Sequence, residues 1–258
     1  MKILFLGDVV AKKGRKVLDD YLAEVKREHN INLVIANGEN AAHGRGITRN
    51  IYKWFLESGV SAVTMGNHTW GNSDIYNFID EVDKLVVPLN YPDGTPGQGV
   101  VTFKYNQLTV SVVSLIGMVY MQGTVKCPFQ TMDDLLEELD SDIILVDFHA
   151  EATSEKIALG HYLDGRVTAI LGTHTHVPTL DARILPKGTA YQTDIGMNGV
   201  LDGIIGVEKE GIIRRFKTGL PTKFTPLEEG PLQFNATIIE INDLSHKTTN
   251  IYTVNIVR

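Results

Sequence analysis

The sequence predicts an α/β protein with a central mixed sheet system and helices outside it. Strand and helix patterns alternate over the first 65 residues, which indicates parallel strands joined by right-handed crossovers. Residues 99–117 alternate around a polar turn at Asn106-Gln107, which predicts an antiparallel hairpin. The last sixty residues contain few helix signals but two alternating segments that predict strands, 232–241 and 248–257.

The first 65 residues supply three predicted strands and two predicted helices. Residues 2–6 are a short apolar run, which predicts a buried strand. A helix is expected over about 14–29, because apolar side chains recur there every three to four positions. Branched apolar residues predict two further strands at 31–36 and 60–65, and Thr48 is expected to cap the helix between them.

The alternation of predicted helices and strands resumes after the hairpin. Thr131 and Asp134 resemble a capping box, which predicts a helix from about Thr131 to Leu139. An apolar strand, a helix and a second apolar strand are then expected at 142–148, 154–163 and 166–172.

The bulk composition is that of an ordinary globular protein. The chain has 258 residues, of which 43% are hydrophobic and 21% charged, and we expect them to form one domain. The net charge of −7 argues against a broad basic surface for duplex nucleic acid. A small anionic ligand would therefore need a local positive charge, which bound metal ions can supply.

The N-terminus and the cysteine content indicate a cytoplasmic protein. The apolar run at the N-terminus is too short to span a membrane, and no signal-peptide cleavage site follows it. Cys127 is the only cysteine, so no intramolecular disulfide can form. It is interpreted as an incidental small residue, with a reactive thiol as the alternative.

Polar residues with metal-binding or proton-transfer chemistry follow five of the predicted strands. Each could by itself belong to an ordinary turn or be a hydrogen-bonded structural residue. The carboxyl ends of parallel strands share one edge of a sheet, however, and ligands bind in the crevice there. We therefore expect one metal site built from Asp8, Glu39, Asn40, Asn67, His149, His174 and His176, with His68 beside it.

The chemistry of this set favours two metal ions. It contains no thiolate, which excludes a structural zinc site of the cysteine type. Seven nitrogen and oxygen ligands are too many for one tetrahedral ion, but they suit two ions that share a carboxylate, and Glu39 is the natural bridge. The only negative ligands are Asp8 and Glu39, so two divalent ions would leave the centre cationic and able to bind an anionic phosphate.

Two metal ions close together are a device for in-line displacement at phosphorus. His68 follows the predicted ligand Asn67, so it is placed to protonate a leaving alkoxide or to steady the phosphoryl group. The alternative is that His68 only packs against its neighbours or coordinates a metal ion.

The order of these motifs resembles that of the calcineurin-like metallophosphoesterase superfamily. Those enzymes carry successive Asp, Gly-Asp, Gly-Asn-His, His and Gly-His-x-His motifs. The match is closest to the YmdB-like bacterial phosphodiesterases, through "FLGDVV", "NGENAAHGRGIT", "TMGNHTW" and "TDIGMNG", and it covers essentially the whole chain. The chain departs from the wider superfamily at Val10, where a histidine is usual, at Glu39, where the bridging residue is usually Asp, and at Thr69, where an acid is usual.

The resemblance implies a four-layer α/β/β/α sandwich and a phosphodiesterase that acts through a metal-activated hydroxide. The implied substrates are 2′,3′-cyclic nucleotides or related small phosphodiesters, the implied metals are iron or manganese, and a homo-oligomer is common in this branch. No membrane or duplex nucleic-acid partner is implied. One ion would be held by Asp8, Glu39, Asn40 and His176, and the other by Glu39, Asn67, His149 and His174.

Two rival functions stay open on the sequence. The protein could be a phosphomonoesterase or protein phosphatase, or a regulatory protein that binds metal and nucleotide with little turnover. The segment 117–130 is either a lid that supplies Tyr120 or Phe129 to stack on a base, or an ordinary packed loop. The glycine-rich segment 193–203 is expected to shape the rim of the pocket.

Overall fold

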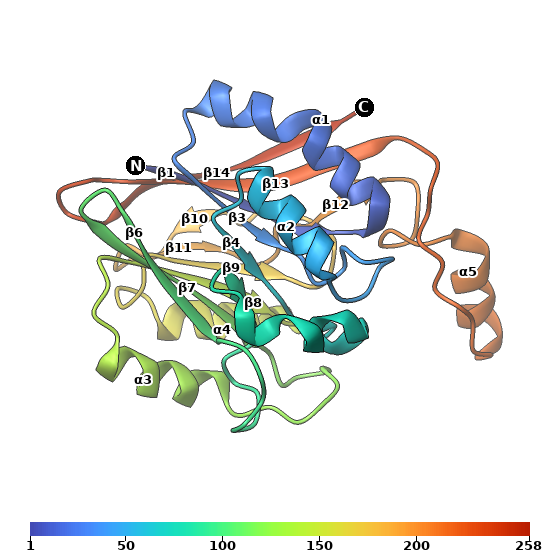
Figure 1. Cartoon of the computed structure of the whole chain (residues 1–258), viewed down its shortest axis with the longest axis horizontal. Coiled ribbons are helices and arrows are strands. Elements are labelled where there is room, and N and C mark those ends of the chain that lie inside the picture. The colour runs from blue at the N-terminus through green and yellow to red at the C-terminus, as the bar shows by residue number, and fades with distance from the viewer.

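Two mixed β-sheets lie face to face in the computed structural model, which describes all residues from Met1 to Arg258 (Figure 1). The first sheet has eight strands in the order β2-β12-β13-β1-β3-β4-β5, and β14 pairs with β13. Its strands are β1 (Lys2–Leu6), β2 (Asp8–Val9), β3 (Leu33–Asn37), β4 (Ala62–Thr64), β5 (Leu85–Val86), β12 (Met197–Val200), β13 (Leu232–Ile241) and β14 (Thr248–Val257). Strands β1, β3 and β4 run parallel, as predicted, and the short strand β5, which was not predicted, continues the parallel order.

The second sheet has six strands in the order β10-β11-β9-β8-β7-β6. Its strands are β6 (Val100–Tyr105), β7 (Leu108–Ile116), β8 (Ile143–His149), β9 (Ala169–Thr173), β10 (Arg183–Ile184) and β11 (Ala190–Gln192). The hairpin β6–β7 is antiparallel, as predicted, while β7, β8, β9 and β11 are parallel neighbours.

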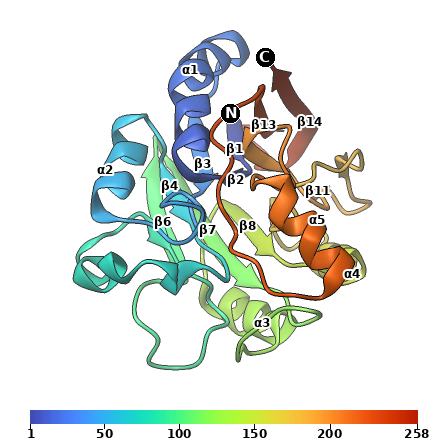
Figure 2. The same ribbon diagram turned by 90° about the vertical axis from the view of Figure 1, so that its right-hand side faces the viewer.

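Helices cover the outer face of each sheet. Helices α1 (Ala11–His29) and α2 (Arg49–Glu57) lie on the first sheet, and α3 (Pro128–Glu138) and α4 (Thr153–Tyr162) lie on the second (Figure 1). A fifth helix, α5 (Lys209–Thr218), stands apart at one end of the sheets (Figure 2). No helix combines the length and the apolar character needed to cross a bilayer.

Three separate apolar cores hold these layers together. The first packs side chains of α1 and α2, such as Leu18 and Phe55, against the first sheet. The second lies between the sheets, where Phe5 and Val112 are fully buried. The third packs α3 and α4 against the second sheet. The order of layers is therefore α/β/β/α, which confirms the predicted fold class.

Most predicted strands and helices match the structure within a few residues, but one cap and one helix differ. The capping box predicted at Thr131 is wrong, because α3 already begins at Pro128, a residue preorganised for the first helical position. The Thr131 hydroxyl donates instead to the carbonyl of Cys127, which precedes the helix. Helix α5 was missed: its exposed surface gives little apolar periodicity, although Gly219 ends it in a left-handed conformation.

Candidate metal centre

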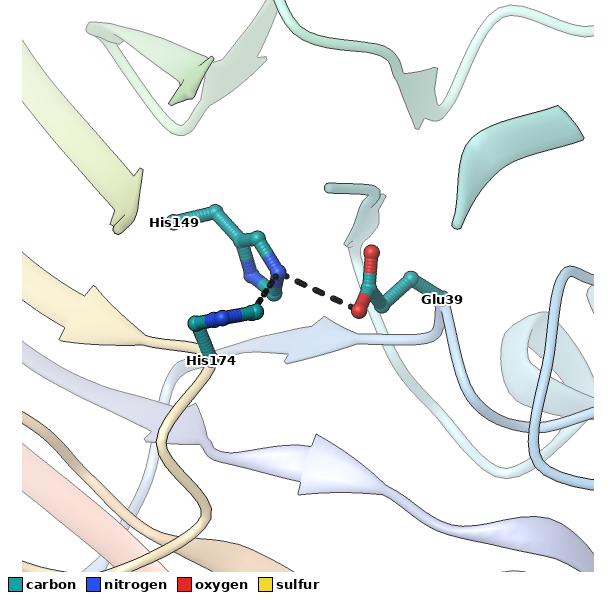
Figure 3. A group of neighbouring side chains, drawn as sticks. All are labelled: Glu39, His149 and His174. Carbon is teal, nitrogen blue, oxygen red and sulfur yellow. Dashed lines mark hydrogen bonds and ion pairs between the residues drawn. The ribbon is translucent and has the colours of Figure 1, made fainter. Parts of the chain in front are cut away.

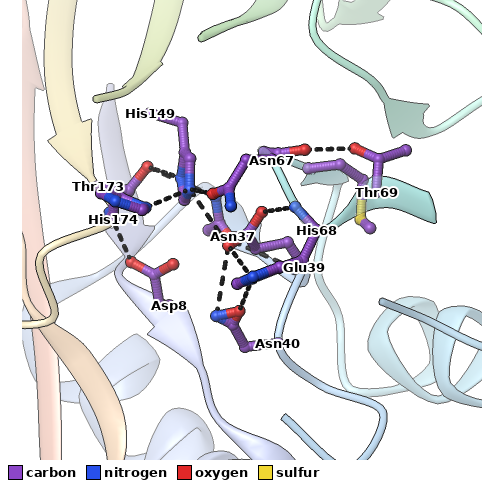
Figure 4. Close-up of polar contacts among 12 residues, drawn as sticks. Asp8, Asn37, Glu39, Asn40, Asn67, His68, Thr69, His149, Thr173 and His174 are labelled. Carbon is purple, nitrogen blue, oxygen red and sulfur yellow. Dashed lines mark hydrogen bonds and ion pairs between the residues drawn. The ribbon is translucent and has the colours of Figure 1, made fainter. Parts of the chain in front are cut away.

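The ends of strands from both sheets meet at one edge and bring the predicted site residues together (Figure 4). The first sheet contributes Asp8 and the loops after β3 and β4, and the second contributes His149 at the end of β8 and the loop after β9. Asp8, Glu39 and His149 are almost completely buried. The sequence pattern predicted this convergence, and the family resemblance implied the two sheets from which the strands come.

One group of side chains surrounds His149. Its Nε2 atom lies 3.1 Å from Glu39 Oε1, 2.8 Å from Asn67 Oδ1 and 3.0 Å from His174 Nδ1 (Figure 3). Ligand atoms of Glu39, His149 and His174 all lie within 4.8 Å of one another. These groups can hold one cation.

A second group surrounds His176. Its Nε2 atom lies 3.6 Å from Asp8 Oδ1 and 3.3 Å from Asn40 Nδ2. Asn40 Nδ2 in turn lies 3.3 Å from Glu39 Oε1, so Glu39 belongs to both groups. The position of Glu39 fits the bridging role predicted for it.

The residues present fit two metal ions. Asp8 Oδ1 is a buried carboxylate oxygen without any hydrogen-bond partner, and such an atom is strongly destabilising unless a donor or a cation compensates it. The other ligand atoms are imidazole nitrogens and carboxamide or carboxylate oxygens, which suit iron, manganese or zinc. The donor set therefore suits cations of this kind, and Glu39 lies between the two groups of side chains.

The charges of the buried groups depend on one another. Burial opposes ionisation of Glu39, but the charge of His149 and hydrogen bonds from His149 and His68 outweigh it and hold the pKa of Glu39 well below its usual range. Burial lowers the pKa of His176, but the negative charge of Asp8, whose Oδ1 atom lies 3.6 Å from His176 Nε2, raises it overall to about 9. Cation binding at neutral pH must therefore displace a proton from His176.

His174 behaves differently from His176. Burial, together with repulsion from His149, lowers the pKa of His174 to about 3. This imidazole is thus neutral at physiological pH and can bind a cation without losing a proton.

The two histidines after β9 do not continue the strand. The strand ends at Thr173, and the backbone φ angles of His174 and His176 are 101° and 66°. Such left-handed backbone is uncommon outside glycine and is concentrated at functional sites. As a result His174 faces His149, while His176 faces Asp8.

A buried carboxylate orients His149 from behind. The Thr173 hydroxyl lies 2.9 Å from His149 Nδ1 and donates to Asp147 Oδ1 at 2.6 Å. Asn37 Nδ2 donates to the other Asp147 oxygen at 3.0 Å. Burial raises the pKa of Asp147 to about 6. Asp147 was not among the predicted site residues, although an aspartate within the apolar run of β8 is a usable signal.

A buried ion pair supports the loop that carries His174. Lys156 Nζ donates to Asp194 Oδ2 at 2.7 Å and to the Thr173 carbonyl at 2.8 Å. Asp194 Oδ2 also accepts from the Thr175 amide at 3.1 Å. Asp194 belongs to the segment 193–203, none of which lines the cavity. The prediction that this segment forms the rim of the pocket is therefore wrong. Asp194 instead lies behind the candidate centre and supports the loop that carries His174.

His68 reaches the cavity above the centre. Its backbone amide donates to Glu39 Oε2 at 2.9 Å, and its Nδ1 atom lies 3.2 Å from Glu39 Oε1 and 3.3 Å from Asn40 Oδ1. Its Nε2 atom has no partner within the protein, and the side chain is 29% exposed. His68 thus has one ring nitrogen fixed and the other available to a ligand.

A cavity of about 540 Å³ opens above these residues. Tyr120 borders it, as one reading of the segment 117–130 predicted. Phe129 does not, because it belongs to α3 and packs edge to face on Tyr162 at 5.2 Å. Glu151, which was not predicted, also borders the cavity, and its carboxylate lies 3.2 Å from His174 Nε2.

Comparison with known proteins gives consistent results. A sequence model described as YmdB-like protein matches residues 4–254. A Bacillus subtilis protein named 2′,3′-cyclic-nucleotide 2′-phosphodiesterase is 49% identical over 253 residues, which cover 97% of this chain and 95% of that protein.

Two solved structures share the fold over the whole chain. A hypothetical protein from Thermus thermophilus has a TM-score of 0.94 at 44% identity, and the match covers 100% of this chain and 99% of the other. A phosphatase from Mycoplasma pneumoniae has a TM-score of 0.95 at 38% identity, with 100% and 93% covered.

Proposed function

Because this chain belongs to the YmdB-like protein family, we propose that it is a metal-dependent phosphodiesterase for 2′,3′-cyclic nucleotides or related small phosphodiesters. The observation that carries the proposal is the pair of donor groups that share buried Glu39 at the floor of a cavity. The buried Asp8 Oδ1 atom supports it, because this oxygen accepts no hydrogen bond and is available to a cation.

The proposed ligands follow the two groups of side chains. Asp8, Glu39, Asn40 and His176 would hold one ion, and Glu39, Asn67, His149 and His174 the other. Iron and manganese are the proposed metals. When bound, such ions neutralise charge on the phosphoryl oxygens and lower the pKa of a water molecule that can attack phosphorus.

The residues of the chain supply orientation and a proton. Glu39 fixes the His68 ring through the backbone amide and Nδ1, so that Nε2 is left for the substrate. Hydrolysis of a 2′,3′-cyclic phosphate at the 2′ position adds water to phosphorus and breaks the bond from phosphorus to the 2′ oxygen. That oxygen must gain a proton, and we assign its delivery to His68 Nε2.

Removal of metal tests the function directly. Chelator-treated protein is expected to lose hydrolysis of adenosine 2′,3′-cyclic phosphate, and Mn²⁺ or Fe²⁺ is expected to restore it, measured by chromatography of the products. Phosphomonoesters should turn over far more slowly. A preference for monoesters would favour a phosphatase, and no turnover in protein shown to bind two ions would favour a regulatory protein.

His68→Ala tests the proton donor. We expect hydrolysis of the cyclic nucleotide to fall by about 10² to 10⁴, because the departing alkoxide is no longer protonated. A p-nitrophenyl diester, whose leaving group departs as an anion, should lose much less activity. Metal affinity, measured by calorimetry, is the control and should be unchanged. Equal losses on both substrates would contradict the role of His68 as the acid.

A further inference from the structure

The segment between β12 and β13, residues 201–231, forms one wall of the cavity above the candidate centre. This segment contains α5 and stands at the end of the sheets (Figure 2). It contributes Ile205, Val207, Arg215 and Phe224 to the cavity. None of these residues belongs to the proposed metal ligands or to the proposed proton donor. The proposed function therefore assigns no role to this wall.

The wall is anchored to the centre. His176 Nδ1 lies 2.9 Å from the Ile205 carbonyl, and Ile205 has a φ angle of 48°, which is rare for a β-branched residue. The Glu208 amide donates to the Thr225 carbonyl at 2.9 Å, which ties the two ends of the α5 excursion together. The position of the wall is therefore fixed relative to a proposed metal ligand.

Arg215 and Phe224 lie against each other in this wall. The guanidinium carbon of Arg215 lies 5.4 Å from the centre of the Phe224 ring, and the ring is 40% exposed. Arg215 makes no ion pair with a carboxylate, although the chain carries a net charge of −7. An aromatic ring and a planar guanidinium are the groups on which nucleic-acid bases stack.

We propose that Arg215 and Phe224 form the nucleobase subsite of this protein, an inference that rests on the proposed function. The cationic centre at the floor of the cavity accounts for the phosphate, so the wall is left to contact the other end of the substrate. Apolar Ile205 and Val207 beside the stack suit a base better than a second phosphate. The cavity of about 540 Å³ lies within the range typical of small-molecule sites.

Two substrates with the same reacting ring test the subsite. One is adenosine 2′,3′-cyclic phosphate, and the other is methyl ribofuranoside 2,3-cyclic phosphate, which has no base. We expect Phe224→Ala and Arg215→Ala to lower kcat/KM for the nucleotide by about ten- to a hundredfold. The same variants should leave kcat/KM for the base-free substrate unchanged.

Matched controls come from the same helix. Arg214→Ala removes the same charge and Phe216→Ala removes the same ring from exposed positions that do not border the cavity. Both should behave as the wild type on both substrates. Equal losses on the two substrates, or no loss in Arg215→Ala and Phe224→Ala, would overturn the subsite and leave the phosphodiesterase proposal intact.

The subsite and the proposed function can fail separately. If the wild-type protein hydrolyses neither substrate, the proposed function fails. Calorimetric binding of adenosine 3′-monophosphate to the metal-loaded protein then decides the subsite. Weaker binding in Arg215→Ala and Phe224→Ala than in Arg214→Ala supports it, and equal binding in all variants overturns it.

Discussion

Replacing Glu39 with Gln is expected to reduce diester hydrolysis by at least about 10³-fold and to abolish binding of the second metal ion. Glutamine preserves the volume of the side chain and can still accept the His68 amide hydrogen bond. It cannot offer an anionic oxygen to both donor groups, which Glu39 does through its position between His149 and Asn40. Calorimetry with Mn²⁺ should show the loss of a site, and product chromatography the loss of turnover.

The pH dependence of stability separates this effect from misfolding. In metal-free protein the charge of Glu39 helps to raise the pKa of buried His149 above 6.5, although burial alone would lower it. A raised histidine pKa stabilises the fold below 6.5 and loses this effect as the pH rises through the higher folded value. The lowered pKa of Glu39 stabilises the fold above 4.5 and is lost in acid.

The two shifts describe one ion pair, which exists only where Glu39 is ionised and His149 is protonated. Its full stabilisation is therefore present between about pH 4.5 and 6.5 and is lost when His149 becomes neutral at higher pH. The Tm of metal-free Glu39→Gln should fall furthest below that of the wild type in this window, and the two values should converge at higher pH. A variant that is folded at pH 8 but binds no second ion supports the bridging role. Two ions bound with wild-type affinity would show that Glu39 is not the bridge.

The parts of the fold and site that were predictable depend on local pattern. Strands β1, β13 and β14 were placed at their observed bounds, because apolar runs and alternation are local properties of the chain. The convergence of the site also followed from sequence, since each polar group directly follows a strand. Predicting that Asp8 and His149 belong to one site required only the rule that the carboxyl ends of parallel strands lie at the same edge of a sheet.

The supporting residues of the site that were not predicted depend on contacts between segments far apart in the sequence. Asp147 is close to Thr64 and Asn37 only after the two sheets pack together. Lys156 pairs with Asp194 across 38 positions, and a lysine within an amphipathic helix pattern is usually an exposed residue. The left-handed backbone at His174 and His176 was equally hidden, because neither residue is glycine.

Lys156→Met is expected to destabilise the protein by about 3–5 kcal/mol, because it leaves the Asp194 carboxylate buried without its cation. Both side chains of this pair are only 1% exposed. For a chain of this size the loss corresponds to a fall in Tm of roughly 10 °C, measured by calorimetry. Metal affinity should also fall by about ten- to a hundredfold, because Lys156 and Asp194 hold the backbone on either side of His174.

Two variants show whether the ion pair itself causes the effect. Lys16→Met breaks an ion pair with Asp20 on the exposed face of α1 and should leave Tm and metal affinity unchanged. Adding Asp194→Asn to Lys156→Met removes the buried uncompensated charge and should restore most of the lost Tm. Metal affinity should stay low in the double variant, because the Thr173 carbonyl still lacks its donor. If Lys156→Met melts at the same temperature as Lys16→Met, the buried pair does not support the loop of the centre.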